Sequence, residues 1–243
     1  MDRLQRRRAK NFAEFWGSFF INFTIQNINV GNAYYTPFVI GTAFFISVFL
    51  AAKISGGHLN AAVTFSVYLN ARKRDPSEPF DKYAWEIAYQ VLGGLTAGFL
   101  TFFMGFTLVA LEPSNEITLL EAGILETFFS ILLCLCYANL SDPKFPPSDP
   151  VIAGIIIGAT KFLTNMTLGN LTGGIINPST AFSIGLSRAI FISPEGMQIM
   201  WLYVIAPLVG ALIAHWFYER FMKDEIAKRA SQRMQSAISD HGN

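Results

Sequence analysis

Long uncharged stretches of apolar residues alternate along the chain with short polar segments. No charged residue occurs between Glu14 and Lys53, and the same holds for residues 87–111, 162–187 and 196–218. A helix needs about 20 apolar residues to cross the hydrocarbon core of a bilayer. The pattern therefore predicts six membrane-spanning helices, at residues 11–28, 35–54, 81–109, 118–140, 150–166 and 197–221.

Two further apolar segments, residues 60–70 and 177–187, are too short to cross a bilayer. Each follows a Gly-Gly pair and begins at an asparagine, Asn60 or Asn177. Asparagine favours the N-cap position because its side-chain oxygen accepts from a backbone N–H that has no partner in the helix. The two segments are predicted to be half-helices entered through irregular loops. Such backbone is tolerated at membrane depth only where it is buried in protein or lines a water-filled cavity.

Composition agrees with a membrane protein. Of 243 residues, 52% are hydrophobic and 14% are charged, against about 25% charged in an average soluble domain. The net charge of +1 argues against a nucleic-acid partner. We find no Ser/His/Asp set, metal-ligand cluster or phosphate-binding loop, so we expect no enzymatic activity, no metal and no cofactor. Cys134 and Cys136 are two residues apart and point in different directions on a helix, which implies no disulfide.

Basic residues gather in the connections on one side of the predicted spans. Five precede the first span, five lie at or between the facing ends of the second and third, and five lie from residue 220 onward, at and beyond the end of the sixth, whereas residues 26–34 and 112–117 contain none. The positive-inside rule therefore places both termini in the cytoplasm, in a plasma membrane or an internal organelle membrane. The predicted parts are a basic N-terminus (1–10), two halves (11–110 and 111–221) and a cytoplasmic tail (222–243) that is either an amphipathic surface helix or solvated.

The two halves are related by an internal repeat. Residues 55–66 align with residues 172–183 with five identities in twelve, at a constant offset of 117. Each half also opens with a glutamate in an apolar helix, Glu14 or Glu126. Three crossings per half is an odd number, so the second half enters from the opposite face, and a pseudo-twofold axis in the membrane plane relates the two. The N-termini of the half-helices are thus predicted to meet near the midplane.

This meeting point has a defined chemistry. Each helix N-terminus carries about half a positive charge, which repels cations. Asn60 and Asn177 can cap their helices with the amide oxygen and donate from the amide nitrogen into a lumen. Backbone carbonyls of the two loops can form a ladder of acceptors, from Gly56, Gly57, His58, Leu59, Gly173, Gly174, Ile175 and Ile176. The alternative is that both asparagines are only helix caps in a closed protein.

Residues 11–221 resemble the aquaporin (major intrinsic protein) family. The resemblance rests on two Gly-Gly-x-x-Asn loops in a six-span inverted repeat, with the motifs Asn60-Ala61-Ala62 and Asn177-Pro178-Ser179. It implies an all-α integral membrane fold and a passive channel for water, with glycerol, urea or ammonia as further solutes, assembled as a homotetramer in a lipid bilayer. The alternatives are a closed or junction-forming member of this fold, or a secondary transporter.

The resemblance also assigns roles to the intramembrane glutamates. In the family such residues support the re-entrant loops by accepting from their backbone N–H groups, which is the role expected of Glu14 and Glu126. A proton relay is the alternative, because ionisable residues inside a membrane are functional candidates by default.

Family members select solutes at an aromatic/arginine constriction, and here this sequence departs from the pattern. The matching positions are Ile40, Gly174 and Thr180, the last in place of the usual arginine. The fourth position is ambiguous: the count forward from residue 150 gives Lys161, and the count back from residue 177 gives Asn165.

We favour Lys161 because the helix register from residue 150 is rigid, so that the extra residues would fall in the following loop. As the constriction residue, Lys161 would repel cations and donate hydrogen bonds in place of the arginine. The alternative is that its side chain snorkels to the outer interface. The absence of a bulky aromatic residue predicts a wider or less polar constriction.

Overall fold

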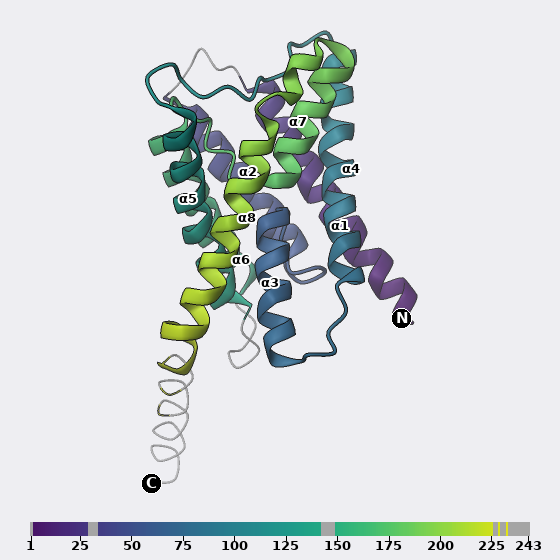
Figure 1. The fold of residues 1–243 in the computed structure, drawn as a ribbon. Coiled ribbons are helices and arrows are strands. Elements are labelled where there is room, and N and C mark those ends of the chain that lie inside the picture. The colour runs from purple at the N-terminus through teal and green to yellow at the C-terminus, as the bar shows by residue number, and fades with distance from the viewer. Residues whose placement is uncertain (1, 29–33, 142–148, 226–227, 229–231, 233–243) are drawn as a thin grey trace.

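The computed structural model describes residues 2–28, 34–141, 149–225, 228 and 232, which form a bundle of helices without strands (Figure 1). Eight α-helices are present in these residues: α1 (Arg3–Asn27), α2 (Thr36–Ala51), α3 (Ala61–Arg74), α4 (Asp81–Phe103), α5 (Leu119–Leu140), α6 (Pro150–Leu168), α7 (Pro178–Phe191) and α8 (Met200–Phe217). A 3-10 turn, η1 (Pro194–Met197), precedes α8, and a π-helical turn, η2 (Tyr218–Met222), follows it.

All six predicted long helices and both half-helices are present, but several bounds differ. Helix α1 begins at Arg3 rather than at residue 11, so the basic N-terminus is largely helical. The reason is a capping box, in which Asp2 accepts from the Gln5 N–H at 2.7 Å and the Gln5 side chain accepts from the Asp2 N–H at 3.1 Å. Helix α4 ends six residues earlier than predicted because Gly105, at φ 81°, adopts the left-handed conformation that terminates helices.

The half-helices α3 and α7 enter the bundle from opposite sides and point their N-termini at each other (Figure 1). Both are longer than predicted and extend to Arg74 and Phe191. In Figure 1 the start of α1, the end of α3 and the end of α8 all lie on the lower side of the bundle, and α7 lies on the upper side. The basic residues at the start of α1, the end of α3 and the end of α8 therefore lie on one side of the bundle.

The packing of the long helices follows the repeat. Helix α1 packs against α4, as α5 does against α8, and α2 packs against α6. Gly41 on α2 and Gly158 on α6 are equivalent positions, and each lies against the other helix's backbone. A Cβ on Gly41 would lie 2.9 Å from the Gly158 carbonyl oxygen, and one on Gly158 would lie 2.8 Å from that of Gly41. The repeat thus brings its own two copies into contact.

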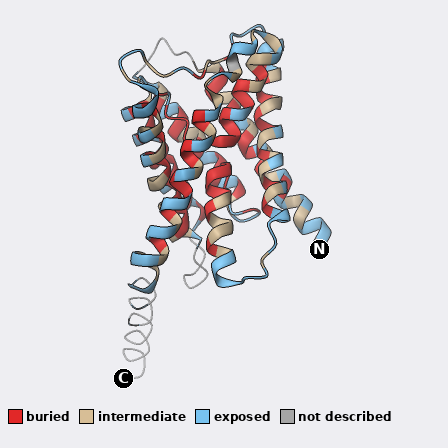
Figure 2. Ribbon diagram, viewed as in Figure 1, coloured by how far each residue is buried: buried red, intermediate tan, exposed pale blue. Residues whose placement is uncertain are grey.

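Buried positions concentrate around the half-helices, and the outer faces of the bundle are exposed (Figure 2). Many of the exposed side chains are large and apolar, while the interior contains glutamates, glutamine and asparagines. Among the described residues, three helices are both long and apolar enough to span a bilayer: α5, α6, and α8 with its continuation to Glu225. Most of the predicted tail, and residues 142–148 between α5 and α6, lie outside the described residues.

Candidate functional site

Asn60 and Asn177 cap the half-helices α3 and α7. The Oδ1 atom of each accepts from the backbone N–H groups two and three residues further on, at 2.8 and 3.4 Å for Asn60 and at 3.1 and 3.4 Å for Asn177. Both asparagines are buried. The capping predicted from the sequence is therefore present at both half-helices.

The two asparagines also bind each other's loops. The Asn60 Nδ2 atom donates to the carbonyl oxygen of Ile176 at 2.8 Å, and the Asn177 Nδ2 atom donates to that of Leu59 at 2.9 Å. These bonds are equivalent under the repeat and tie the two halves together at their meeting point. An amide nitrogen carries two hydrogens, so each asparagine keeps one further donor beside the bond to the opposite loop.

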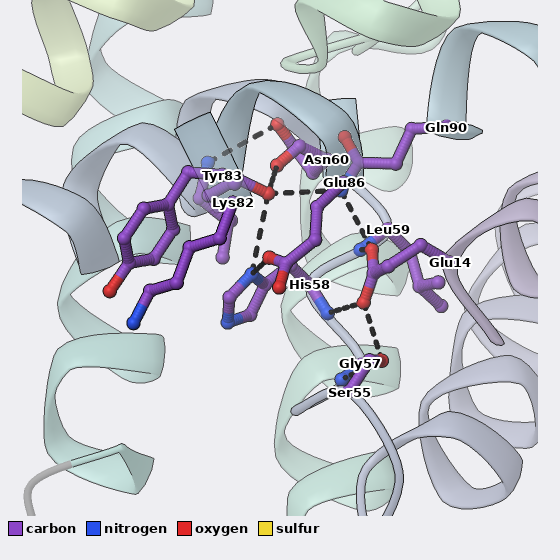
Figure 3. A network of polar contacts seen from close by, with 12 residues as sticks. Glu14, Ser55, Gly57, His58, Leu59, Asn60, Lys82, Tyr83, Glu86 and Gln90 are labelled. Carbon is purple, nitrogen blue, oxygen red and sulfur yellow. Dashed lines mark hydrogen bonds and ion pairs between the residues drawn. The ribbon is translucent and has the colours of Figure 1, made fainter. Parts of the chain in front are cut away.

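The first loop is held by the Glu14 carboxylate of α1 (Figure 3). Glu14 accepts from the Ser55 hydroxyl at 2.6 Å, from the His58 N–H at 3.0 Å and from the Leu59 N–H at 2.7 Å. It also accepts from the side-chain nitrogen of Gln90 on α4, at 2.7 Å. A fully buried carboxylate is costly unless its oxygens are hydrogen-bonded, and here both of them are.

The second loop repeats this arrangement with Glu126 of α5. Its carboxylate accepts from the Thr172 hydroxyl at 2.6 Å, from the Ile175 N–H at 3.1 Å and from the Ile176 N–H at 2.6 Å. Each donor is displaced by 117 residues from its counterpart in the first loop. Both glutamates accept from backbone N–H groups of a loop, as a supporting role requires. That supporting role stays a prediction.

The loop backbone is strained at equivalent places. Leu59 and Ile176 adopt left-handed conformations, at φ 52° and 43°, that non-glycine residues rarely take. The N–H group of each is bound by a glutamate, which holds the strained conformation. Four loop glycines also have positive φ values and bring no side chain to their positions: Gly56, Gly57, Gly173 and Gly174.

Two buried tyrosines fix loop carbonyls and were not found from the sequence. The Tyr137 hydroxyl of α5 donates to the Gly57 carbonyl oxygen, and the Tyr203 hydroxyl of α8 donates to the Thr172 carbonyl oxygen at 2.9 Å. These two carbonyls are therefore already bonded within the protein. Tyr203 of α8 is the repeat equivalent of Glu86 of α4, at the same offset of 117. Extending the alignment beyond the loops would therefore have drawn attention to Tyr203 and Glu86.

Lys161 of α6 lies beside the second loop. Its Nζ atom donates to the carbonyl oxygens of Gly174 at 2.7 Å and Ile175 at 3.2 Å, and lies 5.1 Å from the centre of the Phe44 ring. The residue is only 2% exposed, so it does not snorkel to the surface as the alternative supposed. Phe44 is its equivalent in the repeat, and the sequence reading missed it. Glu126 interacts with the ammonium electrostatically.

Asn165 lies one helical turn further along α6. Together with Ile40 it lines a cavity of about 250 Å³ that is bordered also by Gly173 and Ile175 of the second loop. The sequence predicts that the extra residues fall in the loop after α6. In the structure they also lengthen α6, which ends at Leu168. The two counts therefore lead to neighbouring positions: Lys161 contacts Gly174, and Asn165 faces the cavity beyond it.

Thr180, in the place of the family arginine, is buried at the first turn of α7. Its N–H donates to the Asn177 cap at 3.4 Å, but its hydroxyl has no hydrogen-bond partner among the described residues. A buried hydroxyl without a partner is uncommon in a folded protein. The position thus holds a buried polar group that no described residue binds.

An inverted repeat whose two half-helices meet at paired asparagines defines a passive transmembrane channel. The family model described as "Major intrinsic protein" matches residues 5–218. The chain belongs to the major intrinsic protein family. The sequence prediction of the family, of the all-α fold and of a channel for water or small solutes is confirmed.

Named relatives cover most of the chain. "Glycerol uptake facilitator protein-like 6" of Lactiplantibacillus plantarum is 31% identical over 89% of this chain and 99% of its own length. "Aquaporin AqpM" of Methanothermobacter thermautotrophicus is 31% identical over 74% of this chain and 73% of its own length. The solved structure of the aquaglyceroporin from Plasmodium falciparum shares the fold, with a TM-score of 0.77 at 20% identity, covering 89% of this chain and 97% of that one.

Proposed function

We propose that this protein is a water channel in which a single file of water molecules passes Asn60 and Asn177. The observation that carries the proposal is the reciprocal pair of amide bonds, from Asn60 to Ile176 and from Asn177 to Leu59. These bonds fix both amide groups in place and leave one N–H of each as a donor to a solute. A water molecule between them accepts twice, so its hydrogens point away from the centre.

Proton exclusion follows from the same centre. The N-termini of α3 and α7 contribute partial positive charges that oppose a hydronium ion. The orientation that two amide donors impose on a water molecule interrupts the chain of hydrogen bonds along which a proton would hop. The loop carbonyls that no described side chain binds, those of Gly56, His58 and Gly173, provide acceptors on either side. The relatives named aquaporin agree with water as the first solute.

The constriction is assigned to Ile40, Lys161, Gly174 and Thr180, with Asn165 at its entrance. Lys161 takes the place of the family arginine as the cation-repelling group, because its ammonium is buried against the second loop. Small neutral solutes such as glycerol, urea and ammonia are secondary candidates, since neither a bulky aromatic side chain nor an arginine stands at these four positions. The relative named as a glycerol uptake facilitator is consistent with them.

The side of the bundle that carries the start of α1 and the end of α8 is proposed to face the cytoplasm, by the positive-inside rule. The membrane is a plasma membrane or an internal organelle membrane. Exposed apolar side chains on the outer faces suit lipid and neighbouring subunits, in line with a homotetramer. Examples are Trp16, Phe20, Phe38, Phe128 and Ile155. No catalytic activity is proposed.

The test is stopped-flow light scattering of proteoliposomes, first with an impermeant osmolyte and then with glycerol, urea and ammonia. We expect water permeability at least tenfold above that of protein-free vesicles. Asn60→Ala should lower it strongly, whereas Asn139→Ala should not, since the Asn139 amide donates to its own helix, to the Leu135 carbonyl oxygen. Absence of water flux would favour a closed or junction-forming protein, and saturable ion-coupled uptake would favour a transporter.

A further inference from the structure

Glu86 is a buried carboxylate that has no role in the water path proposed above. It lies on α4, one helical turn before Gln90, and is 5% exposed. The sequence reading passed over it because it follows the charged connection between α3 and α4. A carboxylate at such a position is expensive unless it has a partner, and it marks a functional group by default.

The partner of Glu86 is His58 in the first loop (Figure 3). The Glu86 Oε2 atom lies 3.3 Å from the His58 Nδ1 atom, an ion-pair contact, and has no hydrogen-bond partner among the described residues. The Thr64 hydroxyl lies 3.3 Å from the same nitrogen. A carboxylate beside one ring nitrogen favours a hydrogen on that nitrogen, Nδ1, which leaves Nε2 as an acceptor.

The Nε2 atom of His58 faces the loop backbone at Gly56. A Cβ atom on Gly56 would lie 3.1 Å from Nε2, so the absence of a side chain there leaves the space next to this nitrogen open. Within the described part of the chain, Nε2 makes no hydrogen bond. It is also not a fully buried atom without a partner, so it keeps some accessible surface. The geometry therefore leaves an acceptor with open space beside it in the loop that leads to Asn60.

The repeat shows that this arrangement belongs to one half only. The equivalent of Glu86 is Tyr203, which also holds its loop, through the Thr172 carbonyl oxygen. The equivalent of His58 is Ile175, which cannot titrate. Both α4 and α8 thus contact a loop from the same position, but only the first half places an ionisable pair there.

Other charged or titratable groups act on His58 from the elements packed around it. Glu14 and Lys10 of α1 interact with it electrostatically, and the Tyr137 ring of α5 lies edge-on at 6.3 Å. Glu14 is already bound to four donors. Glu86 is the carboxylate in direct contact with the imidazole.

We propose that Glu86 is a positioning residue of the channel, which orients His58 so that its Nε2 atom accepts a hydrogen bond from the water file on the α3 side of Asn60. This inference rests on the proposed water pathway. Waters whose hydrogens point away from Asn60 suit an acceptor at this place. A proton on Nε2 replaces that acceptor with a donor and adds a positive charge to the lumen, so water permeability falls in acid.

The test is water permeability of proteoliposomes between pH 5 and pH 8, with equal pH on both sides, for wild type, Glu86→Gln, Glu86→Asp, His58→Ala and the double variant Glu86→Gln/His58→Ala. We expect the wild type to lose at least half of its permeability in acid. Glu86→Gln should lower permeability about threefold at pH 7.5 and move the acid inhibition to lower pH, because it removes the charge that favours the imidazolium. Glu86→Asp should restore part of both properties.

The double variant separates positioning from general support. If Glu86 acts through His58, Glu86→Gln adds no further effect once His58 is alanine. Glu78→Gln serves as the matched control, since Glu78 is a carboxylate of the α3–α4 connection that binds Lys82 and Tyr83; its pH profile should equal that of wild type.

Additive effects of the two variants, or an unchanged pH profile in Glu86→Gln, would overturn the inference while the wild type still conducts water. Loss of water flux in the wild type would instead overturn the proposed function itself.

Discussion

The backbone N–H of Ala61 lies 3.4 Å from the Oδ1 atom of Asn177 and donates to it. The bond exists because alanine stands at the first position of α3, where the repeat equivalent in α7 is Pro178, which has no N–H to donate. It adds a link between the two half-helices beyond the reciprocal amide bonds. Its length marks it as weak.

We therefore predict that Ala61→Pro stabilises the protein. Asn60 has an extended backbone, at φ −159° and ψ 124°, which suits a residue before proline, and proline reduces the freedom of the unfolded chain by about 0.4–1 kcal/mol. Thermal unfolding in detergent should show a higher midpoint, with water permeability kept. Ala62→Pro is the control: its N–H donates to Asn60 at 2.8 Å, so this variant should be destabilised. A drop in stability for Ala61→Pro would contradict the prediction.

Glu126→Gln should destabilise the second loop. The glutamine amide group brings hydrogens to a place where the donors of Thr172, Ile175 and Ile176 converge. Hydrogen bonds to a charged group contribute about 1.5–3 kcal/mol each, so a clear fall in the thermal midpoint and a loss of water flux should accompany each other. Full stability and water flux, combined with loss of a proton-dependent activity, would point instead to the proton relay.

Lys161→Met should raise the proton leak of proteoliposomes about tenfold or more. An elementary charge about 6 Å from a passing cation opposes it by about 3 kcal/mol at an effective dielectric constant of about 20, and Glu126 offsets part of this. The change also frees the Gly174 and Ile175 carbonyl oxygens for solutes. A pH-sensitive dye measures the leak, and stopped flow measures the water. Lys161→Arg should retain low leak, and wild-type values in Lys161→Met would refute the filter role.

Thr180→Val should leave stability unchanged or slightly raised. The Thr180 hydroxyl is buried without a partner in the described structure, and replacing such a group with an apolar one of the same shape costs little. If the hydroxyl faces the solute path, glycerol and urea permeability should fall about twofold or more. Thr64→Val is the contrast. The Thr64 hydroxyl accepts from the Gln90 side chain at 2.9 Å, so its loss should lower the stability of the protein. A strongly destabilised Thr180→Val would show that the hydroxyl has a structural partner.

The fold was readable because its causes are local or periodic. Uncharged runs gave the spans, Gly-Gly-x-x-Asn gave the half-helices, and an odd number of crossings per half gave the inversion. The bounds were less readable, because α1 begins at the Asp2 capping box and α4 ends before Gly105 with its positive φ, and apolar runs record neither feature. At the constriction, the counts to Lys161 and Asn165 conflicted because the length of α6 depends on its packing rather than on hydropathy.

The sequence by itself determined the membrane class, the inverted repeat, the capping asparagines and the presence of a glutamate in an apolar helix of each half. Each of these depends on residue type at a fixed spacing. Only the tertiary structure decided which groups from different helices meet: Glu86 with His58, Lys161 with Gly174, and the Ala61 N–H with Asn177. The physical reason is that side chains far apart in the chain reach one another only once the helices have packed, and the hydrogen bonds then depend on separations of a few ångströms.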